Sequence, residues 1–176
     1  AVPYRLSAVE TAKLIGAHLI HISTDYVFDG KSGPYIELDR PNPVSYYGRT
    51  KLASENVIRT NGVSSTIVRT MILYGAGYNV KINFASWVLK SLMDGKPFRV
   101  VDDQIGNPTL ADDLAFAIIK IVELGRSGLY HISGPDLVSR YDFALAIAEI
   151  FEFNKKLISP IKTFILKQPA CRPMKS

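Results

Sequence analysis

The sequence has little of what secreted and membrane proteins depend on. It holds one cysteine, Cys171, in 176 residues, so no disulfide can form within the chain. So little cysteine favours a reducing compartment, and we expect a cytoplasmic location. No apolar run approaches the roughly 18 residues of a membrane-spanning helix, and no secretory signal opens the chain. We therefore expect no membrane partner.

A glycine-rich phosphate loop is also missing. The 12 glycines never fall into Gly-x-Gly-x-x-Gly, the pattern that seats a dinucleotide pyrophosphate on a helix N-terminus. Only 22 residues precede Ser23, and they predict a single helix over 8–15 that ends at Gly16. We therefore expect this chain to be the C-terminal two-thirds of a longer protein whose first part carries that loop.

Concentrated charge is absent as well. Lys and Arg number 21 against 16 Asp and Glu, which gives a net charge of +5 and a pI of about 9.3. The basic residues are scattered, and the longest run is Lys155-Lys156. An ordinary solvated surface explains this pattern, so we expect no nucleic-acid partner. Attraction for a phosphorylated small molecule remains an open alternative.

Patterns of strands and helices alternate along the chain. Strands are predicted at 18–22, 65–70, 98–101 and 129–132, and helices at 46–59, 84–93, 109–124 and 139–153. This alternation predicts an α/β fold with a mainly parallel sheet.

Local signals refine these boundaries. Capping boxes starting at Thr109 and Ser139 are expected to open the last two helices. The segment from Ser159 onward contains three prolines and is expected to be irregular.

Two motifs carry the chemistry expected of this chain. The hydroxyl residues Ser23 and Thr24 follow the strand at 18–22, and so lie at its carboxyl end, where open α/β sheets bind ligands. Tyr47 and Lys51 stand four residues apart in a predicted helix, which puts them on one face. An ammonium beside a phenol stabilises the phenolate, so the pair predicts a general acid and base.

Five blocks of sequence extend these motifs. They are Ser23-Thr-Asp-Tyr-Val-Phe-Asp-Gly30, Pro43 to Glu55, Asp103-Gln-Ile-Gly-Asn-Pro-Thr109, Gly128-Leu-Tyr-His-Ile-Ser-Gly134 and Arg172-Pro-Met-Lys-Ser176. In this order they resemble the dTDP-4-dehydrorhamnose reductases, a branch of the extended short-chain dehydrogenase/reductase family. The resemblance implies an NAD(P)-binding Rossmann-like fold, a doubly wound parallel sheet with a small α/β substrate-binding part. Residues 1–80 would form the C-terminal half of the Rossmann-like domain, and 81–176 mainly the substrate-binding part, with some segments returning to the sheet.

The resemblance also implies roles for individual residues. The catalytic set would be Thr24, Tyr47 and Lys51, with Tyr47 as the proton donor and Thr24 holding the reacting carbonyl. The cofactor, NADPH or NADH, would contact Ser23, Tyr47, Lys51 and Arg69. The nucleotide-sugar substrate would contact Asp25, Tyr26, Asn83, Phe84, Gln104 and Arg172. No metal is implied, and a homodimer is a candidate assembly.

Several of these residues have a purely structural alternative. Asp25 could cap a turn, Asn83 could cap a helix, and Arg172 could be an ordinary surface arginine. Thr109 is expected first as a helix cap and second as a nucleotide contact. Trp87 is expected in the core, because it continues an apolar helix stripe.

The three histidines lack the spacing of metal ligands. His18, His21 and His131 lie in or beside predicted strands, and we interpret them as core or edge residues.

One position departs from the family wording. The family shows Arg-Thr-Ser-Trp-x-Tyr-Gly, whereas this chain has Arg69-Thr-Met-Ile-Leu-Tyr-Gly75, so Ile72 replaces a Trp near the sugar. Reduction of dTDP-4-dehydrorhamnose to dTDP-rhamnose is the favoured function. The alternatives are a sugar-nucleotide epimerase or dehydratase, and a non-catalytic regulatory homologue like the β subunit of methionine adenosyltransferase.

Overall fold

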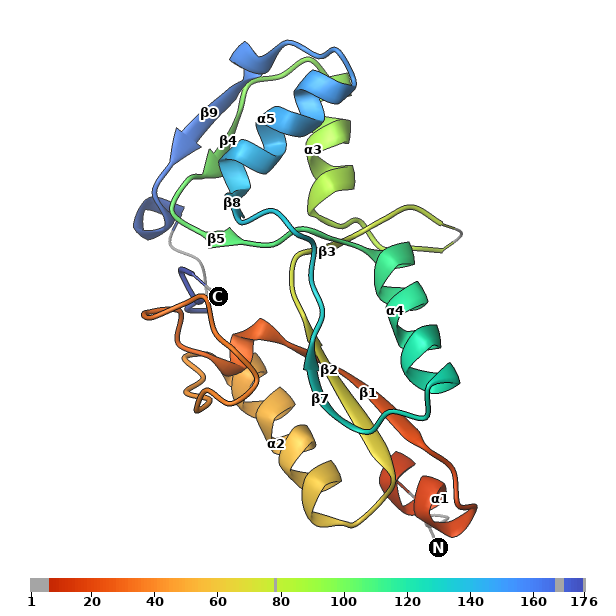
Figure 1. Ribbon diagram of the computed structural model, residues 1–176. Helices are drawn as coiled ribbons and strands as arrows, with labels where there is room; N and C mark the ends of the chain where they lie inside the picture. The colour runs from red at the N-terminus through yellow and green to blue at the C-terminus, as the bar shows by residue number, and fades with distance from the viewer. Residues whose placement is uncertain (1–6, 78, 167–169, 176) are drawn as a thin grey trace, which may run out of the picture.

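A three-stranded parallel sheet forms the lower half of the molecule (Figure 1). The structure is a computed structural model that describes residues 7–77, 79–166 and 170–175. β1 (Leu19–Thr24), β2 (Ser65–Thr70) and β7 (Gly128–His131) pair in the order β1-β2-β7. β7 comes from the second half of the chain, so this sheet joins segments that are far apart in the sequence.

Helices cover both faces of this sheet. α2 (Tyr46–Thr60) packs on one face, where Ile58 meets Ile67, and α4 (Ala111–Glu123) packs on the other, where Leu114 meets Val68. Ile67 and Val68 can serve opposite faces because successive side chains of a strand alternate. Each such aliphatic side chain contributes about 1.5–3 kcal/mol when it is fully buried.

The short helix α1 (Ala8–Leu14) lies on the α2 side of the sheet. Its Val9 joins Ile58 and Ile67 in one buried cluster. Ser7 opens the helix with a capping box to Glu10, and Gly16 follows its end at φ +66°. The helix predicted at 8–15 is therefore confirmed.

A second core lies in the upper half of the molecule (Figure 1). There α3 (Phe84–Met93) and α5 (Arg140–Ile150) pack on a parallel pair formed by β4 (Phe98–Val101) and β9 (Ile158–Ile161). The buried cluster consists of Val88, Leu92, Val100, Ala144, Ile147, Ala148 and Ile158.

Short elements connect the two halves. The two-residue strands pair as β3 (Leu73–Tyr74) with β6 (Thr109–Leu110) and β5 (Ile105–Gly106) with β8 (Val138–Ser139). The 3-10 helices are η1 (Asp25–Val27), η2 (Lys155–Leu157) and η3 (Thr163–Leu166).

Within the described ranges, no helix has the length and apolar composition needed to cross a bilayer.

The predicted α/β class with parallel strands is confirmed, and β2, β4 and α3 begin and end where the sequence placed them. The irregular segment expected from Ser159 onward is partly wrong, because β9 pairs with β4 through it. Pro160 is tolerated there because β9 pairs with β4 alone among the described strands, so a residue without an N–H can face the unpaired side. The assignment of 1–80 and 81–176 to separate parts stays a prediction.

The helix cap predicted at Thr109 is wrong. α4 begins at Ala111, and its N-cap residue Leu110 makes no side-chain cap bond. The Thr109 hydroxyl instead donates to the Asn107 carbonyl at 3.1 Å and accepts from the Gly134 N–H at 3.3 Å. Thr109 is 2% exposed because it pairs within β6, so its hydroxyl has to find partners inside the protein. The cap predicted at Ser139 is confirmed by its bond from the Asp142 N–H.

Candidate active site

The carboxyl end of β1 holds the predicted catalytic threonine. Thr24 is buried, and its hydroxyl donates to Asp25 Oδ1 at 3.0 Å while accepting from the Tyr26 N–H at 3.3 Å. The second bond starts the η1 turn, so the hydroxyl is fixed at the point where the strand ends.

The first turn of α2 packs directly against this strand end. A Cβ at Gly48 would lie 2.1 Å from the Tyr26 carbonyl oxygen, so only glycine permits this approach. Ser45 caps the helix by accepting the Gly48 N–H at 3.0 Å. The Tyr47 ring then meets the Tyr26 ring edge-on, with centroids 5.6 Å apart. Tyr47 is 52% exposed, which leaves its phenol accessible to a ligand.

Lys51 lies one turn further along the same face of α2. Its ammonium donates to the Ile22 carbonyl at 2.7 Å, two residues before Thr24. An ammonium has three N–H groups, so two remain for other acceptors. The structure therefore brings Thr24, Tyr47 and Lys51 together where β1 ends. Tyr46 lacks a Lys four residues on and is 76% exposed.

Ser23 and Arg69 enter a buried network on the α2 side of the sheet. The Ser23 hydroxyl donates to Glu55 Oε1 at 2.5 Å, and Arg69 binds both Glu55 oxygens, at 3.0 and 2.7 Å. Arg69 also contacts His131 Nε2 at 3.3 Å and lies over the Phe28 ring at 5.1 Å. Sequence reasoning missed Glu55, although its place four residues after Lys51 on α2 could have suggested it. Cofactor contacts of Ser23 and Arg69 stay predictions.

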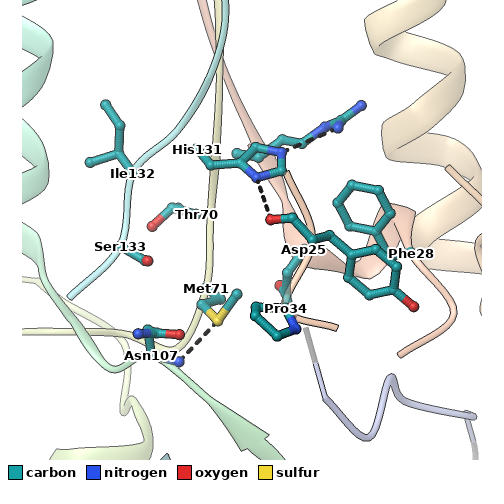
Figure 2. A pocket seen from close by; sticks show the side chains of 11 residues that line it. Asp25, Phe28, Pro34, Thr70, Met71, Asn107, His131, Ile132 and Ser133 are labelled. Atoms are coloured by element: carbon teal, nitrogen blue, oxygen red, sulfur yellow. Dashed lines mark hydrogen bonds between the residues drawn. The ribbon is translucent and has the colours of Figure 1, made fainter. Parts of the chain in front are cut away.

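A cavity of about 140 Å³ opens beyond the strand ends (Figure 2). Asp25, Thr70, Asn107 and His131 contribute polar groups to it. The Thr70 hydroxyl is buried and has no hydrogen-bond partner within the described part of the chain. Thr70 is the register partner of Thr24, so both side chains point to the same face of the sheet. The cavity thus offers a ligand the Thr70 hydroxyl, which lies beside Thr24 in the sheet.

His131 closes the edge of the sheet beside this cavity. Its backbone N–H donates to Glu37 Oε1 at 2.7 Å. Its ring Nδ1 lies 3.3 Å from the Tyr35 carbonyl oxygen, a contact drawn as a dashed line in Figure 2. Burial lowers the pKa of His131, and the bond from the backbone amide of His131 lowers the pKa of Glu37. The imidazole ring therefore lies between the Tyr35 carbonyl and the Arg69 guanidinium, where burial disfavours its charged form. The described residues contain no cluster of three or more side chains able to hold a metal ion.

A second cavity, of about 200 Å³, lies between the upper core and the end of the chain. It brings together three residues predicted to bind substrate, Phe84, Gln104 and Arg172. Trp87, Arg99 and Arg140 also line it and were not predicted at this site. The core position expected for Trp87 is wrong, since the side chain is 38% exposed and packs edge-on against Phe98 at the cavity.

Charge and aromatic surface combine in this second cavity. The Arg140 guanidinium lies 4.8 Å from the centre of the Phe84 ring. None of the ion pairs formed within the described residues involves Arg99, Arg140 or Arg172. Burial lowers the pKa of Arg140, while burial raises the pKa of Tyr26 against the opposing pull of the Arg172 charge. The cavity suits a ligand with both an anionic group and a flat ring.

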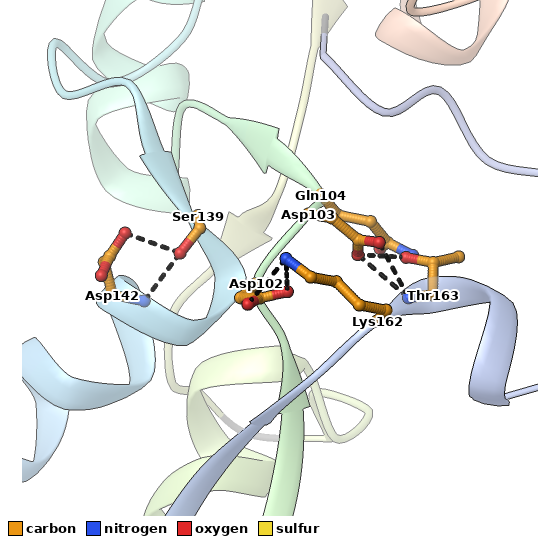
Figure 3. A network of polar contacts seen from close by, with 7 residues as sticks. All are labelled: Asp102, Asp103, Gln104, Ser139, Asp142, Lys162 and Thr163. Atoms are coloured by element: carbon orange, nitrogen blue, oxygen red, sulfur yellow. Dashed lines mark hydrogen bonds and ion pairs between the residues drawn. The ribbon is translucent and has the colours of Figure 1, made fainter.

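Gln104 is held in place by a polar network (Figure 3). Its Nε2 donates to Thr163 Oγ1 at 3.1 Å, and that hydroxyl donates to Asp103 at 2.6 Å. The neighbouring Lys162–Asp102 ion pair, at 2.9 Å, adds a second link between the same two segments. These contacts fix the Gln104 side chain at the wall of the second cavity.

Asn83 acts as a helix cap in this structure. Its Oδ1 accepts the Ser86 N–H at 3.1 Å, and its Nδ2 donates to the Gly75 carbonyl at 2.7 Å. Both ends of the amide are therefore engaged within the protein, and a contact with substrate stays a prediction.

One protein-family model covers nearly the whole chain. Residues 5–176 match the model of the RmlD substrate binding domain. The spore coat polysaccharide biosynthesis protein SpsK of Bacillus subtilis is 44% identical over 144 residues, which cover 81% of this chain and 49% of that protein. A dTDP-4-dehydrorhamnose reductase of Aggregatibacter actinomycetemcomitans is 38% identical over 170 residues, or 90% of this chain and 57% of the enzyme.

A solved structure extends the likeness to three dimensions. The dTDP-4-dehydrorhamnose reductase of Bacillus anthracis, in complex with NADP, matches with a TM-score of 0.89 at 33% identity, over 95% of this chain and 58% of that chain. Methionine adenosyltransferase 2 subunit beta of Bos taurus is 33% identical over 156 residues, 85% of this chain and 47% of that protein. The chain thus spans about half the length of the curated relatives it matches.

Proposed function

Because the chain belongs to the RmlD substrate-binding domain family, we propose that the full-length protein is a nicotinamide-dependent reductase of a nucleotide-activated sugar. Its reaction would reduce the C4 ketone of dTDP-4-dehydrorhamnose to give dTDP-rhamnose. The observation that carries this proposal is the meeting of Thr24, Tyr47 and Lys51 at the end of β1. The two relatives named as reductases of this kind support it.

Proton transfer is the part of the reaction that this chain would perform. The exposed Tyr47 phenol would donate its proton to the C4 oxygen as negative charge develops there. The Lys51 ammonium would stabilise the phenolate left behind. Thr24 would release its bond to Asp25 and donate to the same C4 oxygen, which orients the carbonyl.

The residues beside this site fit a nicotinamide cofactor. A bound nicotinamide supplies the hydride. Lys51 keeps two N–H groups for ribose hydroxyls, and the unpartnered Thr70 hydroxyl can meet a further polar group of the ligand. Leaving a buried hydroxyl without a partner costs about 1–3 kcal/mol, so a ligand that satisfies it gains affinity. Either NADPH or NADH would satisfy these contacts.

The second cavity would hold the nucleotide end of the substrate. Arg140 and Arg172 would bind the diphosphate, because guanidinium groups match the geometry of phosphate oxygens. Phe84 and Trp87 offer ring surfaces for the base. Tyr26 links the two sites, because its ring contacts Tyr47 and the Arg172 charge acts to lower its pKa. The sugar would therefore lie over Tyr26 and Asp25.

Titration calorimetry of the full-length protein tests whether the cofactor and the nucleotide bind at separate sites. We expect dTDP to bind wild type, and Arg140→Met to weaken dTDP without changing the affinity for NADPH. Lys51→Met should weaken the binding of NADPH without changing the affinity for dTDP. A matched control is Arg59→Met on the solvent side of α2, away from the second cavity. If Arg140→Met and Lys51→Met weaken both ligands equally, the two sites are not separate and the proposal is wrong.

A regulatory subunit is the second candidate function. The similarity to methionine adenosyltransferase 2 subunit beta favours it. Such a protein would bind a nicotinamide cofactor and a partner protein, yet leave the cofactor unconsumed with every nucleotide sugar. Measuring NADPH oxidation alongside complex formation separates the two candidates.

A further inference from the structure

The 173–175 segment lies between two parts of the fold and is hydrogen-bonded to both. On one side the Lys175 N–H donates to the Gly30 carbonyl at 3.2 Å, in the loop that follows η1. On the other side the Ile105 N–H donates to the Met174 carbonyl at 2.8 Å, on β5. Pro173 is buried at the entrance of this passage. Backbone bonds on both sides therefore fix the segment across the junction of the two halves.

Two glycines make room for this segment. A Cβ on Gly30 would lie 2.4 Å from the Met174 nitrogen, and a Cβ on Gly33 would lie 2.5 Å from the Lys175 carbonyl oxygen. Both contacts are to backbone atoms, which cannot rotate away. Any side chain at either position would therefore push the segment out of its place.

The other glycines show that this closeness is not a general property of turns. Gly62 has φ +66°, close to the φ +75° of Gly30, but a Cβ there would meet nothing within 4 Å. Gly62 needs only its backbone conformation, as in an ordinary helix terminus. Gly30 needs both its conformation and the absence of a side chain.

Arg172 directly precedes the 173–175 segment and is one of the arginines that line the second cavity. Its side chain is exposed and lines the second cavity, and its charge acts to lower the pKa of Tyr26, whose ring contacts the Tyr47 ring. A long exposed side chain has many conformations, so only its backbone anchor can hold the charge near the cavity. That anchor is the buried Pro173 and the bonds that follow it.

We propose that Gly30 and Gly33 are positioning residues for substrate. They form a backbone slot that seats the 173–175 segment and so sets the place of Arg172 at the nucleotide cavity. The identity of the ligand rests on the proposed function, whereas the slot rests on the contacts alone. The loop that follows the catalytic strand thereby controls the affinity of the cavity that binds the other end of the substrate.

The test compares Gly30→Ala with Gly62→Ala in the full-length protein, with dTDP as the probe. The two changes share the cost of a positive φ, but only the first meets the segment. We expect Gly30→Ala and Arg172→Met each to raise the Kd for dTDP about tenfold, through loss of one charged contact. The KM of the nucleotide sugar should rise equally while kcat stays near wild type. Gly62→Ala should change neither constant.

A double variant separates positioning from general damage. In the Arg172→Met background, Gly30→Ala should have no further effect on the Kd, because both act through the same charge. Gly33→Ala, which carries no positive φ, provides a second variant if Gly30→Ala folds poorly. Additive effects, or equal effects of Gly30→Ala and Gly62→Ala, overturn the inference.

Hydrogen exchange tests the slot without any bound ligand. If wild type fails to bind dTDP, the proposed function fails. The slot is then tested by the hydrogen-exchange rates of the Ile105 and Lys175 amides. Both rates should rise in Gly30→Ala and stay at the wild-type value in Gly62→Ala. Unchanged exchange at both amides in Gly30→Ala overturns it.

Discussion

Glu55 and Arg69 form a two-point ion pair between α2 and β2, and their side chains are 0% and 2% exposed. Ser23 joins the pair from β1, and His131 joins it from β7. The network therefore fixes α2, which carries Tyr47 and Lys51, against all three strands of the sheet. Whatever its net energy, a satisfied buried pair of this kind restricts how the helix can move.

Removing one partner of this pair should be strongly destabilising. Glu55→Gln leaves the Arg69 charge buried without its counterion, which costs about 3–5 kcal/mol of unfolding free energy. The matched control is Glu123→Gln, which breaks the exposed Lys120–Glu123 pair and should cost less than about 1 kcal/mol. Urea unfolding followed by circular dichroism measures both. Equal losses in the two variants would contradict the structural role of the buried pair.

Tyr47→Phe should abolish turnover and spare the fold, since only the phenol is lost. Loss of a general acid lowers kcat by about 10²–10⁴-fold. Tyr46→Phe is the matched control, because Tyr46 is the adjacent tyrosine and is 76% exposed. Cofactor oxidation rates and thermal melting curves are measured for both. A Tyr47→Phe protein that retains a near wild-type rate would rule out the assigned proton donor.

Stability should fall in mildly acidic solution because of His131. Burial lowers the pKa of His131 below its ordinary 6.5, so the unfolded chain binds the proton first. The unfolding free energy is therefore fully retained above about pH 6.5 and decreases as the pH drops toward the lowered folded-state pKa. Burial lowers the pKa of His21 in the same direction, whereas Glu37 acts at lower pH.

Replacing the histidine isolates its share of this effect. His131→Asn should flatten the decline in unfolding free energy between about pH 6.5 and 5, as measured by urea titrations at each pH. His21→Asn should also flatten it, because burial lowers the pKa of His21 as well. A His131→Asn protein with the same pH slope as wild type would contradict the lowered pKa of this half-buried imidazole.

Ile72 gives a test of the sugar subsite. Its backbone has φ +44°, a strained conformation for a β-branched residue. Ile72→Trp removes the branching and adds the ring that the family resemblance leads us to expect near the sugar. An aromatic packing face contributes about 0.5–1.5 kcal/mol, so the KM for the rhamnose precursor should fall about threefold to tenfold. Ile72→Leu, which relieves the branching without adding a ring, is the control, and a rise in KM would point to a different sugar.

The sequence predicted regular elements well where local patterns agree with packing. The β-branched run of β2 and the apolar stripe of α3 gave their exact bounds, since both are buried on the faces that the patterns imply. β9 was missed because Pro160 argues against a strand unless the pairing is known. Thr109 fits a capping box by spacing, yet tertiary pairing with β3 takes its backbone away from the helix.

Site residues that lie close together in the sequence were predicted. Those that the fold brings together from distant parts of the chain were missed. The Tyr47 and Lys51 spacing needs only one helix turn. By contrast, Glu55 and Arg69 meet through helix and sheet packing, and Arg140 reaches the second cavity from a helix start more than 30 residues beyond Gln104. Gly30 gave no signal, because the segment that it accommodates lies at the other end of the chain.

The central claim is tested most directly by supplying the full-length protein with dTDP-4-dehydro-6-deoxy-L-mannose and either NADPH or NADH. Cofactor absorbance and the product are followed together. We predict that one cofactor molecule is oxidised for each dTDP-rhamnose formed, and that Tyr47→Phe prevents both. A wild-type protein that binds cofactor and dTDP, but never oxidises the cofactor while it binds another protein tightly, would contradict the reductase function.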